Sequence, residues 1–206
     1  MRTLRTPDNC FANLVDFPYP PRYAEVSDDD GGELRIAYID AGRSTDPAVV
    51  MLHGEPSWSY LYRQVIPPVV AAGYRVIAPD LVGFGRSDKP AEVADHTYAR
   101  HVEWMRNLLF DQLELTDVTL VGQDWGGLIG LRLAAEHPDT FSALVVANTG
   151  LPTGDQQMPE VWLQFREAVR NATNLDISRL IQSGTVRKLS PEVLAAYDAP
   201  FPGEEF

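Results

Sequence analysis

The chain of 206 residues has the length of one ordinary domain, or of one domain with a small appendage. Hydrophobic residues make up 45% of it and charged residues 22%, which supports a buried core and argues against disorder. The net charge of −12 argues against a nucleic acid or an anionic membrane as partner and favours a neutral or weakly polar small molecule.

Predicted strands and helices alternate along most of the chain. Residues 1–22 are rich in proline and are expected to form an irregular arm over the body. Alternating apolar residues predict a strand at 34–39, with a hairpin partner at 23–26 and a turn at 28–32. Pro67-Pro68 are expected to kink or end a helical segment. The remaining predicted elements are buried strands at 48–52, 75–80, 118–122 and 141–147, and helices at 60–71, 98–113 and from 125 onward.

The order of these elements predicts an α/β fold. Strand and helix alternate from about residue 48 to 148, which implies a parallel sheet with helices on both faces. After residue 150 no segment has the pattern of a buried strand. Amphipathic spacing instead predicts three helices, at 161–169, 177–181 and 191–197.

The segment from Val118 to Gly130 combines the end of a strand with the immediate start of a helix. Small residues at 122, 126 and 127 allow the two backbones to approach closely and the residue between them to adopt a strained conformation. This is the pattern of the nucleophile elbow, G-x-S-x-G, of the α/β-hydrolase sheet. The central residue is Asp124 instead of serine. A carboxylate can displace a halide from saturated carbon and leave an ester on itself.

Three segments together resemble the haloalkane dehalogenases of the α/β-hydrolase fold: His53–Tyr60, Gly83–Pro90 and Gln123–Gly127. The opening Arg5–Asp8 and the tail Asp198–Pro202 are similar to the branch that contains the dichloroethane-degrading enzyme. The resemblance covers essentially the whole chain. It implies an α/β-hydrolase core with a mostly parallel sheet in residues 1–150, with strands 1–6 and the elbow, and a partial helical cap in residues 151–206.

The resemblance also implies the reaction, which is hydrolysis of a haloalkane to an alcohol and a halide through an aspartyl ester. Asp124 would be the nucleophile, and the backbone N–H groups of Glu55 and Trp125 would form the oxyanion hole. The indole N–H of Trp125 would bind the halide. One branch of the family has a second halide donor, asparagine, where this chain has Glu55, so the second donor here would be a cap tryptophan, Trp162. No cofactor or metal is expected, and the partners would be a halogenated alkane, water and halide, with a monomeric full-length enzyme.

Two catalytic groups of the family have no counterpart in the sequence. Asn148 stands where the other branch carries its relay acid, so the acid is expected after a later strand. The family's catalytic histidine also follows the positions matched here. The chain is therefore expected to be a C-terminally truncated form of the enzyme that is poorly stable alone. It is expected to release at most one halide, because no base would hydrolyse the ester.

Structural roles compete with several of these assignments. Asp124 could be a helix N-cap, Trp125 could serve packing only, and Trp162 could be cap core without a halide contact. Glu55 is expected to act through its backbone instead of its carboxylate. The side chains expected to have structural roles are His53, ordering its own loop, Asp80 and Asp88, fixing loop structure, Trp58, in packing, and His96, His101 and His137, at the surface or at helix ends.

Two other functions remain open. The chain could be a catalytically incomplete α/β-hydrolase remnant or ligand-binding protein that keeps the pocket without turnover. An epoxide hydrolase would also use an aspartate elbow, but that family usually needs cap tyrosines as acids, and Tyr197 is the only tyrosine in the cap portion.

The lone cysteine and the hydropathy pattern bear on location. Cys10 has no second cysteine with which to form an internal disulfide, which fits a reducing cytoplasm. No apolar run reaches the ~18 residues typical of a membrane span, and the N-terminus has no signal-peptide core. We therefore expect a cytoplasmic protein.

Overall fold

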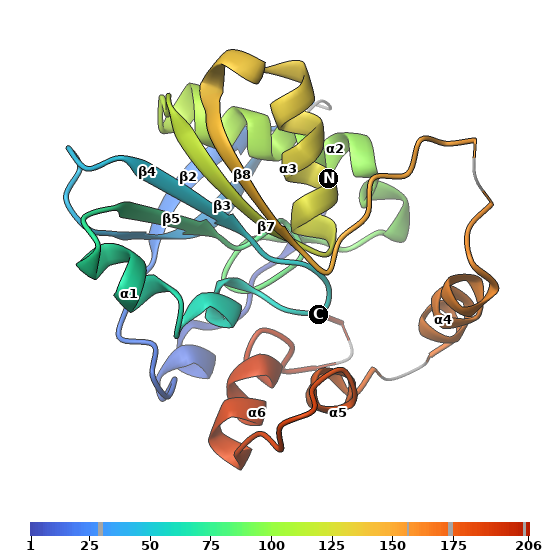
Figure 1. The fold of residues 1–206 in the computed structure, drawn as a ribbon. Helices are drawn as coiled ribbons and strands as arrows, with labels where there is room; N and C mark the ends of the chain where they lie inside the picture. The colour runs from blue at the N-terminus through green and yellow to red at the C-terminus, as the bar shows by residue number, and fades with distance from the viewer. Residues whose placement is uncertain (29–30, 156, 173–174, 204) are drawn as a thin grey trace.

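A twisted six-stranded sheet in the order β2-β3-β5-β4-β7-β8 runs through the computed structural model (Figure 1). The structure describes residues 1–28, 31–155, 157–172, 175–203 and 205–206, so part of the predicted turn at 28–32 lies outside the described residues. Strands β5, β4, β7 and β8 are parallel, whereas β3 is antiparallel to both β2 and β5. The bounds are β2 Arg22–Ser27, β3 Glu33–Ala41, β4 Ala48–Leu52, β5 Arg75–Pro79, β7 Val118–Gln123 and β8 Phe141–Ala147. The predicted α/β fold and its strands are confirmed.

Two hydrophobic cores lie on opposite faces of this sheet. Successive strand residues point to opposite faces, so Val50 and Leu52 of β4 enter one core while Val49 and Met51 enter the other. The first core packs against α2 (Tyr98–Arg106) and α3 (Trp125–Glu136), and the second against α1 (Ile66–Ala71), α5 (Ile177–Ser183) and α6 (Pro191–Asp198). Because both faces are covered, the central strand β4 is apolar along its whole length.

The helical segments follow the prediction with one correction. Pro67 and Pro68 do not kink or end a helix, because they lie in the first turn of α1, where a helix N–H has no partner to lose. The preceding Ser59–Tyr62 is a short 3₁₀ turn. The predicted helix at 98–113 is α2, which continues as a π-helical turn over Asn107–Gln112.

The N-terminal arm is tied to the body by strand pairing and by aromatic side chains. Thr3–Leu4 forms β1, which pairs antiparallel with β6 (Lys89–Pro90). Phe11 and Phe17 are buried in the second core and each contacts Trp58 edge to face. The arm is thus largely irregular, as predicted, and anchored at both of these points.

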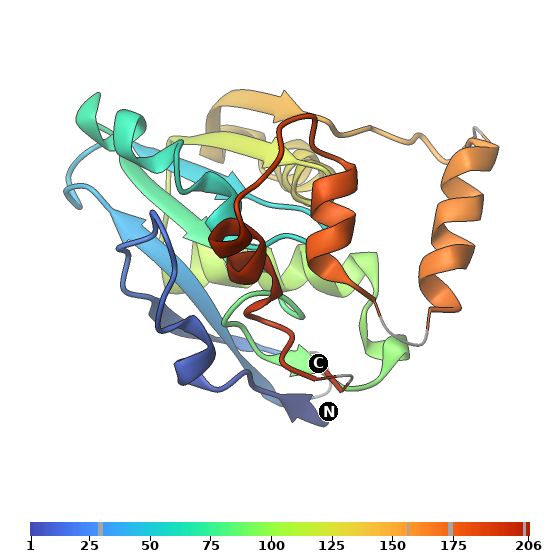
Figure 2. The same ribbon diagram turned by 90° about the horizontal axis from the view of Figure 1, so that it is seen from below.

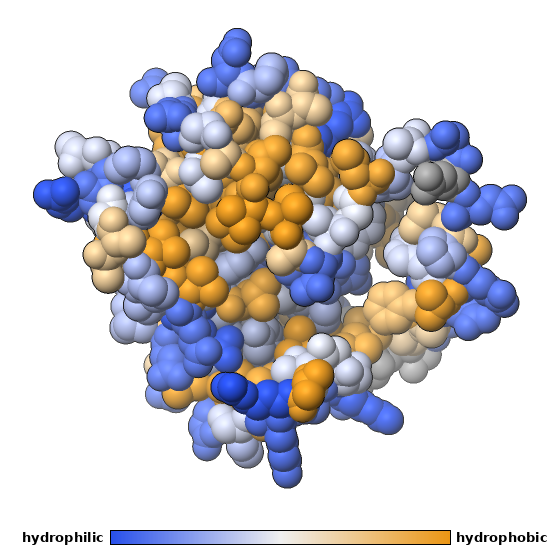
Figure 3. Space-filling view, in the orientation of Figure 1, coloured by the Kyte–Doolittle hydropathy of each residue, from blue (hydrophilic) through white to orange (hydrophobic). Residues whose placement is uncertain are grey.

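Strand β8 forms an edge of the sheet and is largely exposed. Among the described residues it pairs only with β7, and Leu144, Val145 and Val146 are each about half exposed. The apolar surface that gathers over the middle of the molecule in Figure 3 lies across this strand. A long apolar edge is a template for association with another chain, and the predicted low stability of this chain stays a prediction.

The described residues after β8 form three helices, as predicted, but the three are placed differently. Helices α5 and α6 pack beside each other below the sheet, whereas α4 (Glu160–Arg170) stands away from the body in both views (Figures 1 and 2). No described residue of α4 is buried. The predicted division of the chain at residue 150 stays a prediction.

Candidate active site

Asp124 occupies a strained turn between β7 and α3. Its φ of 52° and ψ of −124° lie in a region that L-residues rarely adopt. The turn is held from both sides, because the Asp124 N–H donates to the Asn148 carbonyl at 3.1 Å and the Thr149 hydroxyl donates to the Asp124 carbonyl at 2.8 Å. The side chain makes no capping hydrogen bond to α3. The position is that of an N-cap, but the carboxylate is directed elsewhere.

Close backbone approach around the elbow depends on glycine. A Cβ atom on Gly122 would lie 2.8 Å from the Gly127 Cα, so the strand and helix could not cross at their present separation. A Cβ atom on Gly54 would lie 2.3 Å from the Asp124 Cβ. The elbow glycines therefore have the predicted role, and Gly54 extends it to the loop after β4.

The loop after β4 brings Glu55 to the nucleophile candidate. The Glu55 N–H donates to Asp124 Oδ1 at 3.0 Å, across 69 positions of sequence. Trp125 is the first residue of α3, where a backbone N–H has no intrahelical acceptor. The Glu55 N–H thus contacts the Asp124 carboxylate from a separate segment, and the Trp125 N–H follows Asp124 directly in the chain; the oxyanion hole formed by both groups stays a prediction.

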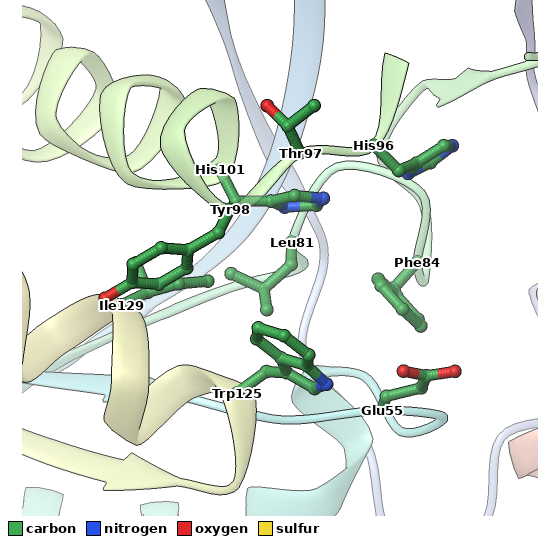
Figure 4. A pocket seen from close by; sticks show the side chains of 9 residues that line it. All are labelled: Glu55, Leu81, Phe84, His96, Thr97, Tyr98, His101, Trp125 and Ile129. Carbon is green, nitrogen blue, oxygen red and sulfur yellow. The ribbon is translucent and has the colours of Figure 1, made fainter. Parts of the chain in front are cut away.

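The Glu55 side chain also takes part in this site, which the sequence did not predict. Its carboxyl group lies beside the Trp125 indole, whose nitrogen points toward it in Figure 4, and the indole favours the ionised form of the carboxyl group. Desolvation raises the pKa of Glu55 and the neighbouring Asp124 charge raises it further, while the Trp125 indole and His96 oppose the shift. The residue is open to solvent on one side, so its carboxyl group sits at the rim of the site.

Two cavities meet at this point. One of about 250 Å³ is mainly apolar and is lined by Trp125, the start of α2 and Leu81 (Figure 4). The other, of about 500 Å³, opens toward the cap residues Leu175 and Ile177 and the C-terminal segment. Glu55 and Phe84 line both cavities. Apolar walls with few polar groups suit a small organic ligand.

Trp162 is not brought to this site. It lies on α4, half-buried, with the Arg166 guanidinium 5.2 Å from its ring centroid. It lines neither cavity, and α4 stands away from the elbow (Figures 1 and 2). Its assignment as a halide donor stays a prediction. The described structure shows only that α4 would have to move to bring the indole near Trp125.

His53 orders its own loop, as predicted. The ring is buried, with Nδ1 3.0 Å from the Gly54 carbonyl and Nε2 accepting from the Leu81 N–H at 2.9 Å. Burial lowers the pKa of His53, so the neutral ring is favoured. With both nitrogens engaged, this histidine has no lone pair to offer a water molecule in the site.

His96 and His101 have a position that the sequence did not predict. Both line the smaller cavity beside Glu55, and their ring centroids lie 5.9 Å apart. Burial, with the neighbouring histidines, lowers the pKa of His101 to about 4. The spacing of Tyr98 and His101 on one face of α2 was the available signal, but the sequence alone gave no reason to orient that face toward the elbow.

The aspartates of the neighbouring loops have the predicted structural role. Asp80 accepts from the Ser59 and Arg86 N–H groups, and Asp88 accepts from Arg5 and from the Arg35 N–H. Trp58 is fully buried packing, as predicted. Tyr197, the candidate acid of an epoxide hydrolase, is also buried and its hydroxyl accepts from Arg63. That placement gives no support to epoxide opening.

Metal binding and membrane spanning are two further classes of function. The described residues contain no group of three or more His, Cys, Asp or Glu side chains placed to hold a metal ion. A membrane-spanning helix is likewise not found in the part of the chain that the structure describes.

Comparison with known proteins decides the family. Residues 47–199 match the model of the alpha/beta hydrolase fold. The chain is 54% identical over its whole length to a haloalkane dehalogenase of Psychrobacter cryohalolentis and 52% identical to one of Mycobacterium marinum. The chain belongs to the haloalkane dehalogenase family. It spans 68% and 69% of the lengths of these two relatives.

The solved structures agree with this assignment. The chain superposes on the tetrameric haloalkane dehalogenase DpaA of Paraglaciecola agarilytica NO2 with a TM-score of 0.92 and 40% identity, covering 100% of this chain and 68% of that one. The α/β-hydrolase fold and the family resemblance are therefore confirmed. The predicted monomeric state is untested for this chain, and the tetramer is a property of that relative.

Proposed function

We propose that this haloalkane dehalogenase chain carries the halide-displacing part of a hydrolytic dehalogenation, with Asp124 as the nucleophile. A carboxylate oxygen of Asp124 attacks the carbon that bears the halogen, the carbon–halogen bond breaks, and the halide leaves with the bonding electrons. The product is an ester on Asp124. In the complete reaction of the family, a general base activates water, which cleaves the ester at its carbonyl carbon and yields the alcohol, the free carboxylate and a proton.

The observation that carries the proposal is the hydrogen bond from the Glu55 N–H to Asp124 Oδ1. This N–H is directed at the oxygen on which negative charge would develop when water attacks the ester. Together with the absence of a side-chain cap on α3, it favours a chemical role for Asp124 over helix capping. We assign the indole N–H of Trp125 and that of Trp162 as halide donors, and the substrate as a halogenated alkane.

Asp124→Asn tests this assignment. Freshly prepared variant protein should lose halide release from 1,2-dibromoethane or 1-bromobutane by on the order of 10⁴-fold or more, because an amide is a poor nucleophile. Intact-mass spectrometry should show an alkyl adduct in the unmodified chain and none in the variant. Peptide mapping after digestion should place the adduct on the peptide that contains Asp124. The exposed Asp139→Asn is the matched control and should react as the unmodified chain does. An undiminished adduct in Asp124→Asn would overturn the assignment.

A further inference from the structure

The Glu55 side chain lies where an anion is expected to bind. The Trp125 indole is a hydrogen-bond donor only, and its nitrogen points toward the Glu55 carboxyl group (Figure 4). In the proposed function that same N–H receives the departing halide. An ionised Glu55 and a halide are both anions, so they would compete for one donor.

The position of Glu55 between the two cavities gives this competition a consequence. Trp125 lines only the smaller cavity. Leu175 and Ile177 line only the larger cavity, on the side of the cap. Glu55 lines both. An anion that moves between the cap-side opening and the Trp125 indole would therefore pass the Glu55 carboxyl group.

The charged and titratable groups around Glu55 come from three segments. Asp124, on the elbow, repels the ionised carboxylate, and His96, before α2, stabilises it. His101, one turn farther along α2, is neutral at ordinary pH because burial lowers its pKa to about 4. The cap-side neighbours Leu175, Ile177 and Phe201 have no titratable side chain. Desolvation and Asp124 together favour the protonated form of Glu55 more than in a free glutamate.

We propose that Glu55 is a proton-dependent gate on the halide site. The ionised carboxylate occupies the Trp125 indole and repels the halide, whereas the protonated carboxyl group leaves the indole available and can itself donate to the anion. Halide binding is thus coupled to uptake of one proton by Glu55, and ionisation of Glu55 expels the halide. The inference rests on the proposed function, since it concerns the same Trp125 donor.

The pH dependence follows from this coupling. Glu55 is protonated below its pKa, so bromide binds most tightly there, and its affinity falls as the pH rises through that value. Well above it, one proton is taken up for each bromide bound, so the affinity falls by about tenfold per pH unit until the ionised form binds by itself. A variant with an uncharged side chain of the same shape at position 55 should bind bromide with the same affinity at every pH.

The quenching of tryptophan fluorescence by bromide measures the bromide affinity without turnover. The titrations are made on the whole chain from pH 4.5 to pH 8.5. Glu55→Gln should bind bromide more tightly than the unmodified chain at pH 8 by about tenfold to a hundredfold, the worth of one charge-assisted contact. Its affinity should also be independent of pH. Glu55→Asp keeps the charge and should keep a falling profile, and the exposed Glu92→Gln is the matched control with an unchanged profile.

The outcomes separate the gate from the function on which it rests. Equal bromide affinities and equal pH profiles for Glu55→Gln and the unmodified chain would overturn the gate while leaving the halide site in place. Weaker binding by Glu55→Gln would overturn it too. Absence of bromide quenching in every variant would remove the halide site and the gate together, whereas the adduct on Asp124 tests the nucleophile independently.

Discussion

Helices α4 and α6 lie in the same C-terminal segment, and both have an apolar face, but only α6 is docked. In α6, Ala196 and Tyr197 are each 4% exposed. In α4, Val161 is 73% exposed and Phe165 is 52% exposed. The strength of the apolar pattern does not explain the difference, because the spacing of apolar residues in α4 is at least as regular as in α6.

The difference lies in the partners that α6 finds in the loop before α1. The Trp58 indole donates to the Ala196 carbonyl at 3.1 Å, and the Tyr60 and Tyr197 rings meet edge to face at 5.2 Å. Arg63 donates to the Tyr197 hydroxyl at 3.3 Å. An apolar face therefore favours packing of a helix against another surface, and shape and polar complementarity decide which surface it packs against.

The largest effect on stability is expected from Tyr197→Ala, which removes the contacts that dock α6. Truncating a buried aromatic residue leaves a cavity and removes the contacts to Tyr60 and Arg63, which should lower the free energy of unfolding by about 3–5 kcal/mol. Urea denaturation followed by tryptophan fluorescence measures it. Tyr74→Ala is the control, since Tyr74 is 41% exposed and should change stability little. Equal effects of the two substitutions would show that α6 is not docked in solution.

Trp162→Phe tests whether α4 closes over the site. If Trp162 is the second halide donor, the variant should bind bromide more weakly by about 1.5–3 kcal/mol, the worth of a hydrogen bond to an ion. Fluorescence quenching by bromide measures the change, and Tyr74→Phe, at an exposed aromatic residue that lines neither cavity, is the control. Unchanged bromide affinity in Trp162→Phe would mean that α4 keeps its present place and that another residue supplies the second donor.

The smallest effect is expected from Phe165→Ser on the exposed face of α4. Because the side chain is half exposed and no described residue of α4 is buried, the free energy of unfolding should change by no more than about 0.5 kcal/mol. The soluble fraction after expression should rise as apolar surface is removed. Ile177→Ser on α5 is the docked counterpart, since Ile177 is 7% exposed, and should cost more. A similar loss of stability in both variants would place α4 against the body.

The sequence by itself determined the elements and the candidate nucleophile. The bounds of β4 and β8 agree with the predicted 48–52 and 141–147, because apolar runs and turn residues act over a few neighbouring positions. Asp124 was identifiable because its flanking glycines and the strand-to-helix change are also local. The proline pair in the first turn of α1 was misjudged for the opposite reason: whether proline starts or breaks a helix depends on where the helix begins.

Only the tertiary structure decided how the site is assembled. The hydrogen bond from the Glu55 N–H to Asp124 spans 69 positions. The Glu55 carboxyl group lies beside the Trp125 indole because the parallel neighbours β4 and β7 end at the same edge of the sheet. His101 of α2 and His96, which precedes that helix, line the smaller cavity where α2 packs against α3, and α6 is docked while α4 is not. Contacts between distant segments depend on how the formed helices and strands pack together, and the residue spacing within one segment does not determine that packing.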